Sequence, residues 1–130
     1  MTNYHFSKTV ACSFDEAIEK ATASLKESGF GVLTTIDVQA ALKEKIGEDF
    51  RPYTILGACN PKLAHQALQS EGKIGTMLPC NVVVQQRDDG QIEISAVDPL
   101  ASMMAIENAD LEGVALQARP LLKAAMDRLR

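Results

Sequence analysis

A β-hairpin signal in the second half of the chain constrains the fold more than any other sequence feature. The triplet Asp88-Asp89-Gly90 separates the segments NVVVQQR and QIEISAV, which are rich in residues that favour strands. An Asp-Gly step between two such segments is the strongest short-range hairpin signal, because it suits the tight turn between antiparallel strands. Apolar and polar residues alternate in the second segment, which predicts one buried and one open face of a sheet.

Two helical patterns lie on either side of the central strands. Ser13 and Glu16 form an S-x-x-E capping box, and apolar residues then recur at helical spacing until Gly29. A second apolar stripe covers residues 111–129 and contains Pro120. An interior proline costs about 3 kcal/mol in a helix, so we expect a kink or a break at that position.

Three more strands and two short helices complete the predicted order. Residues 4–11, 31–37 and 53–59 have the composition of strands, and short helices are expected after Asp37 and Asn60. The order is therefore β-α-β-(α)-β-(α)-β-β-α. We predict an α+β fold: a single, curved, mainly antiparallel sheet with its helices packed on one face.

Composition narrows the function classes. With 130 residues the chain is expected to form a single domain over residues 1–130. The net charge of −4 and the absence of a basic run argue against a nucleic-acid partner. No apolar run approaches the ~18 residues of a membrane span, and no charged leader precedes an apolar block. Three cysteines is an odd count, which favours the cytoplasm and reduced thiols over a disulfide framework.

Two Cys-Asn pairs mark the candidate functional residues. Cys59 directly precedes a helix start at Asn60-Pro61, where amide donors and the helix dipole favour a thiolate. Cys80 opens the fourth predicted strand, and the two cysteines meet only if the third and fourth strands end close together. They are then a redox pair or a soft-metal site. The alternative is that both are small buried residues, which is how free cysteines usually behave.

The remaining polar residues at these junctions have several interpretations. Asn60 is explained as a helix cap, whereas Asn81 is harder to explain because asparagine disfavours strands. Asn81 either ties down the loop after Pro79 or faces a ligand. Zinc fits poorly, since His65 is the one histidine near the cysteines and no C-x-x-C is present; no metal and no cofactor are predicted. A weaker hypothesis is an enzyme with a polar site formed by Asn60, Asn81 and Asp98.

Four segments together resemble the domain of unknown function 302 family. They are GFGVLTTIDVQAALKEKIG, DFRPYTILGACNPKLAHQAL, IGTMLPCNVVV and the DP step after the hairpin, and the blocks GACNP and LPCNVVV are the specific part. The resemblance covers nearly the whole chain. It implies a compact α+β domain, similar in topology to TATA-binding-protein-like folds and commonly a homodimer. It implies no reaction, and likeness to a DNA-binding fold transfers no function.

The sequence therefore favours a cytoplasmic small-ligand-binding or protein-interaction module over an enzyme, with no reaction assignable. We expect a homodimer and a small-molecule ligand, with Cys59, Asn60, Cys80 and Asn81 as the candidate ligand or redox residues. The alternative is a thiol-based redox or soft-metal-binding protein. In that hypothesis Cys59 is the more nucleophilic thiol and Cys80 is its partner.

Overall fold

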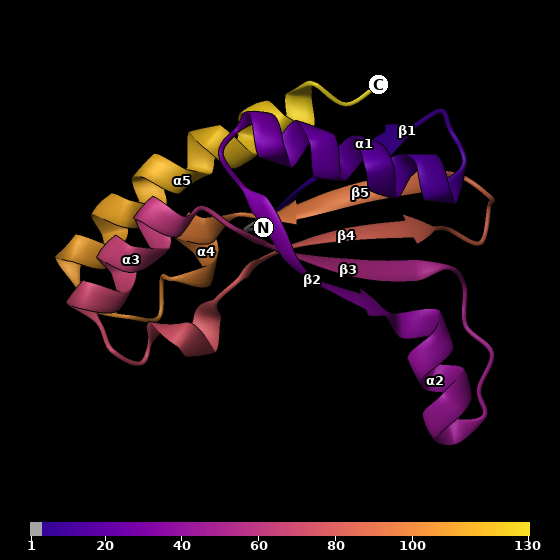
Figure 1. Ribbon diagram of the computed structural model, residues 1–130, viewed down its shortest axis with the longest axis horizontal. Helices are drawn as coiled ribbons and strands as arrows, with labels where there is room; N and C mark the ends of the chain where they lie inside the picture. Colours follow the sequence, from indigo (N-terminus) through magenta and orange to yellow (C-terminus); the bar gives the residue numbers. More distant parts are fainter. Residues whose placement is uncertain (1–3) are drawn as a thin grey trace.

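Five strands form one antiparallel sheet in the computed structural model, which describes residues 4–130 (Figure 1). Across the sheet their order is β1 (His5–Val10), β5 (Ile92–Val97), β4 (Cys80–Gln86), β3 (Tyr53–Cys59) and β2 (Gly31–Asp37). All four neighbouring pairs are antiparallel. The predicted hairpin joins β4 to β5, and Gly90 adopts the left-handed conformation at its turn, with φ of 85°. The predicted α+β class and its antiparallel sheet are confirmed.

Two long helices cover one face of this sheet. Figure 1 shows α1 (Phe14–Glu27) and α5 (Ala109–Asp127) on the same side, with α3 (Pro61–Ser70) and α4 (Pro99–Ser102) at one end of the strands. A short 3₁₀ helix, η1 (Ile74–Met77), leads into β4. None of the helices within residues 4–130 has the length and apolarity needed to cross a bilayer.

The core forms where the helical stripes meet the strand residues of one parity. Ser13 caps α1 as predicted, since its hydroxyl accepts a hydrogen bond from the Glu16 amide at 3.2 Å. The core side chains from both layers are buried to 5% exposure or less: Ala17, Ala21 and Leu25 of α1, Leu111, Ala115 and Leu122 of α5, and Leu56, Val82, Val84, Ile94 and Ala96 of the sheet.

Pro120 does not break α5, contrary to one of the two predicted outcomes. The helix continues through it to Asp127, and Pro120 itself is exposed. Ala118 and Leu122 on the opposite side are buried, so packing of this stripe outweighs the hydrogen bond that proline cannot donate. The tertiary contacts therefore override the local helix-breaking preference.

Helix α2 (Val38–Ile46) differs from the others because none of its residues is buried. Its start is fixed by Asp37, whose carboxylate accepts a hydrogen bond from the Ala40 amide at 2.9 Å. Figure 1 shows the helix projecting from the end of β2, away from the long helices. The adjoining strand is exposed as well: Leu33 is 68% and Ile36 50% exposed, and Ile46 at the far end of α2 is 65% exposed.

Candidate functional site

The register of β3 and β4 determines where the two predicted cysteines lie. Ala58 of β3 is paired with Cys80 of β4, so Cys59 follows one residue beyond that pair. Both side chains line one space between this end of the sheet and helices α3 and α5. We call this space the cysteine crevice; its lining consists of Phe30, Ala58, Cys59, Asn60, Leu63, Ala64, Ala67, Leu78, Pro79, Cys80, Pro99, Met103, Val114, Ala115 and Ala118.

The cysteine crevice is narrow and almost wholly apolar. About 400 Å³ of empty space lies between its side chains, the open mouth included. The centre of a water molecule could occupy only about 30 Å³ of this space. Because the only polar side chains in the lining are those of Asn60 and the two cysteines, the crevice suits a slim apolar group rather than a polar one.

Asn60 is fixed in place in the lining of this crevice. Its side-chain oxygen accepts a hydrogen bond from the Leu63 amide at 3.1 Å, which confirms the predicted cap of α3. Its side-chain nitrogen faces Gly29, where an added Cβ would approach that nitrogen to 3.2 Å. Gly29 also has a φ of 87°, a backbone conformation that favours glycine. Glycine therefore allows both the close approach of the Asn60 amide and the left-handed backbone at this position.

Gly57 allows β2 and the segment before β4 to approach the backbone of β3 closely. A Cβ at this position would collide with Thr34 Oγ1 and would lie 2.8 Å from Pro79 Cγ. Thr34 follows the bulge at which the β2–β3 register shifts, and Pro79 follows a cis peptide bond immediately before Cys80. The absence of a side chain at Gly57 therefore helps to position the segment that carries Cys80.

Burial keeps Cys80 in the neutral thiol form. Desolvation, with a smaller contribution from Cys59, raises the pKa of Cys80 from 9.0 to about 11. Cys12, Cys59 and Cys80 are all free thiols. Within residues 4–130 there is no group of three or more His, Cys, Asp or Glu side chains that could hold a metal ion. Nothing in this part of the chain favours the thiol-redox or soft-metal hypothesis, and His65 is exposed on α3.

The structure does not bring Asn81 to the other three candidate residues. Side chains alternate along β4, so Val82 and Val84 face the helices while Asn81 faces the opposite side of the sheet. Asp98 does not line the crevice, and its carboxylate is already engaged: it accepts hydrogen bonds from the Leu100 amide at 3.0 Å and from Arg119 Nε at 3.1 Å. The polar set of Asn60, Asn81 and Asp98 therefore does not converge on one site.

Asn81 instead lines a wider groove on the face of the sheet that the long helices leave uncovered. We call it the open-face groove; it is lined by Tyr4, His5, Ser7, Tyr53, Asn81, Val83, Gln85, Glu93, Ser95, Ala96 and Val97. The centre of a water molecule could occupy about 420 Å³ of it. Sequence reasoning missed this groove, although the polar members of the alternating strands were visible and were interpreted only as a solvated face.

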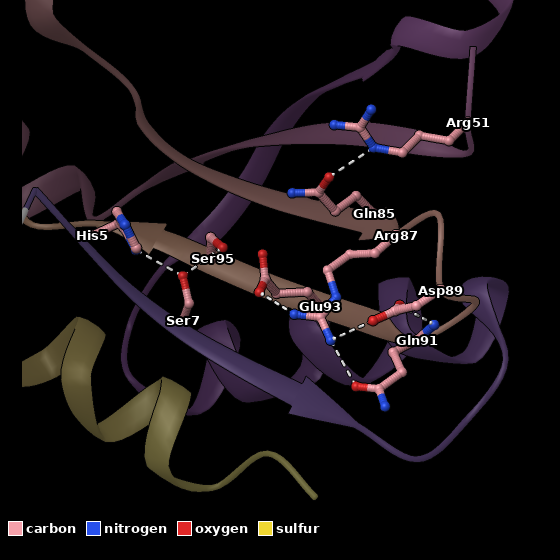
Figure 2. A network of polar contacts seen from close by, with 9 residues as sticks. All are labelled: His5, Ser7, Arg51, Gln85, Arg87, Asp89, Gln91, Glu93 and Ser95. Atoms are coloured by element: carbon pink, nitrogen blue, oxygen red, sulfur yellow. Dashed lines mark hydrogen bonds and ion pairs between the residues drawn. The ribbon is translucent and has the colours of Figure 1, made fainter.

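Figure 2 shows a polar network across this open face. The Ser7 hydroxyl lies 2.7 Å from His5 Nδ1 and 2.7 Å from the Ser95 hydroxyl. At the hairpin, Arg87 contacts the carboxylates of Glu93 and Asp89, each at 3.3 Å. These contacts join β1 to β5 and the hairpin turn to β5, and they hold Ser7, Ser95 and Glu93 of the groove in place.

The fold and its two hollows define a class of protein: a small α+β domain whose single antiparallel sheet has helices on one face and an open groove on the other. The chain belongs to the family described as "Domain of unknown function DUF302", whose sequence profile matches residues 6–129. A crystal structure of an uncharacterized conserved DUF302 protein from Bacillus stearothermophilus is similar, with 32% sequence identity and a TM-score of 0.91. The match covers 99% of this chain and 100% of that one. No curated protein matches the chain in sequence. The family is defined without a function, so membership assigns no reaction.

Proposed function

We propose that this protein is a small-ligand-binding module whose cysteine crevice takes a slim apolar group, such as an alkyl chain. The observation that supports this proposal is that Cys59, Asn60 and Cys80 line one apolar space between the helices and the end of the sheet. Small-molecule sites are mostly apolar clefts with a few polar groups that fix orientation, and this lining has that composition.

The chemistry of the lining favours an uncharged group. Cys80 is a neutral thiol because its pKa is raised to about 11, so it offers no charge to a ligand. The Asn60 oxygen is already engaged by the Leu63 amide, which leaves its NH₂ group as the available donor. A polar ligand buried here would lose more hydrogen bonds to water than the crevice could replace.

The test uses octanol as a slim apolar probe and follows backbone amide signals by NMR. We expect saturable shifts at Cys59, Asn60 and Cys80. Ala64 lines the crevice, so Ala64→Phe fills it and should abolish these shifts. Ala23→Phe, at an exposed position of α1, is the matched control and should keep them. Equal shifts in the Ala64→Phe variant would contradict the proposal, as would their absence in the unaltered protein.

A second part of the proposal is that two copies of the chain associate through β2 and α2. The support is the exposed apolar surface formed by Leu33, Ile36 and Ile46 on an edge strand and a helix without buried residues. Residues 31–36 contain no proline and no charge, the usual devices that protect an edge strand. Antiparallel pairing of this strand with itself about a two-fold axis would therefore bring no like charges together.

Sedimentation velocity tests this association. We expect a dimer for the unaltered protein and a monomer for Ile36→Lys, because a charge on the strand blocks pairing. Leu116→Lys is the control, since Leu116 is similarly exposed, at 53%, but lies on α5. A monomer in the unaltered protein would contradict this part of the proposal and leave the ligand-binding part standing. The cytoplasmic location stays a prediction from the sequence.

A further inference from the structure

Arg51 contacts three side chains, two of which line the open-face groove. Its Nε donates a hydrogen bond to Gln85 Oε1 at 3.0 Å. The guanidinium carbon lies 4.4 Å from the centre of the Phe50 ring and 5.6 Å from the centre of the Tyr53 ring. Figure 2 shows the guanidinium over Gln85, with its two terminal nitrogens turned away from the amide. Cation–π contacts and one hydrogen bond therefore fix the plane of this group before any ligand arrives.

The outer edge of this guanidinium has no partner in the described part of the chain. Arg87, Arg119 and Arg128 each contact a carboxylate at 3.1 to 3.3 Å. For Arg51, no hydrogen bond or ion pair from residues 4–130 reaches the two terminal nitrogens, although the residue is half-buried. Because those three arginines are paired, an oriented guanidinium without an anion is the feature to be explained.

The groove next to Arg51 has room for an apolar group as well as for an anion. Tyr53 and Gln85, the two side chains that position Arg51 from neighbouring strands, both line the open-face groove. Val83 and Val97 supply an apolar floor between the polar side chains of this groove. Its volume of about 420 Å³ lies within the range of small-molecule sites.

We propose that the open-face groove binds a small carboxylic acid with an apolar body, and that Arg51 holds its carboxylate through the two terminal nitrogens. The planar fork of an arginine matches a planar carboxylate with two parallel hydrogen bonds. Glu93 lies two strands from Tyr53 in the same row, about 10 Å away at the usual strand spacing, and its carboxylate is paired with Arg87 at 3.3 Å. It therefore repels a singly charged carboxylate less than a doubly charged phosphate. This site lies on the opposite face of the sheet from the cysteine crevice and does not depend on it.

The test titrates the full chain with benzoate and follows the amide signals of Tyr53, Val83 and Gln85 by NMR. We expect saturable shifts with benzoate and none with benzamide, which has the same shape without the charge. Arg51→Gln should weaken benzoate binding about 10- to 100-fold, since it removes hydrogen bonds to a charged group. Lys62→Gln removes the same charge from an exposed position on α3 and should bind benzoate like the unaltered protein.

A second Arg51 variant and a second anion separate this proposal from a misfolded variant and from a phosphate site. If Arg51→Gln does not fold, Arg51→Lys keeps the charge and should still bind benzoate several-fold more weakly, because an ammonium cannot make the paired contact. Unchanged affinity in the folded Arg51 variants would overturn the proposal, as would equal shifts with benzamide or none with benzoate. Equal or stronger Arg51-dependent shifts with inorganic phosphate would overturn the assignment to a carboxylate.

Discussion

Gly57→Ala is expected to destabilise the protein although it adds a single methyl group. The new Cβ would collide with Thr34 Oγ1 and approach Pro79 Cγ to 2.8 Å, a distance that real Cβ atoms essentially never show. Gly57 is buried on β3, between β2 and β4, and overpacking a buried position costs about 1–3 kcal/mol. Alanine also lowers the conformational entropy of the unfolded chain, which stabilises the folded protein by about 0.4–1 kcal/mol. The net loss is therefore about 1–2 kcal/mol, or roughly 3–10 °C in Tm for a domain of this size.

Chemical and thermal unfolding followed by circular dichroism would measure this loss. Thr34→Ala in the Gly57→Ala background removes the closest clashing atom, so we expect it to recover part of the stability, with Pro79 limiting the recovery. Gly31→Ala is the matched control, because a Cβ there meets nothing within 4 Å and the backbone is extended. A loss below about 0.5 kcal/mol for Gly57→Ala, within the range of neutral surface substitutions, would refute the steric argument.

Three further predictions concern the two Cys-Asn junctions. The Cys80 pKa is raised from 9.0 to about 11, so the stability this thiol contributes is present below pH 9 and is lost as the pH rises toward 11. Urea unfolding should show that the free energy of unfolding is about 1 kcal/mol lower at pH 10 than at pH 8, and that Cys80→Ala lacks this difference. An equal decrease in the free energy of unfolding in the two proteins would contradict the prediction. Asn60→Ala removes the cap of α3 and should cost about 1 kcal/mol, whereas Lys62→Ala nearby should cost little; equal losses would argue against the cap. Alkylation of folded protein at pH 8, mapped by mass spectrometry, should modify Cys80 about 100-fold more slowly than in the unfolded chain, because its thiolate fraction is smaller by that factor, and equal rates would contradict the burial.

The elements of the fold could be predicted because their signals are local. The Asp-Gly turn, the capping box at Ser13 and the cap at Asn60 each act within a few residues, and the structure places each of them as expected. The continuity of α5 could not be predicted in this way. It depends on the burial of Ala118 and Leu122, which outweighs the local effect of Pro120.

The site was less accessible to sequence reasoning because register and surface shape are not local properties. Whether Cys59 and Cys80 share a space depends on the pairing of Ala58 with Cys80, which no spacing in the sequence specifies. The face on which Asn81 lies follows from the period of two along β4, and this signal was available. The unpaired terminal nitrogens of Arg51 could not be predicted from the sequence, because their orientation depends on the contact between this loop residue and Gln85 of β4.

The position of β1 in the sheet has a consequence for how the chain acquires its structure during synthesis. The first strand of the chain pairs with the last one, and Ser7 lies opposite Ser95. At 5–20 residues per second, a ribosome needs roughly 5–20 s to make the intervening segment. Throughout that time β1 lacks its partner, and for most of it α1 has only β2 of the three strands that it contacts, because β4 and β5 are made last. A nascent chain interrupted before β5 would therefore expose apolar surface from both, which makes the interval between the synthesis of β1 and that of β5 the one in which this protein most needs protection from aggregation.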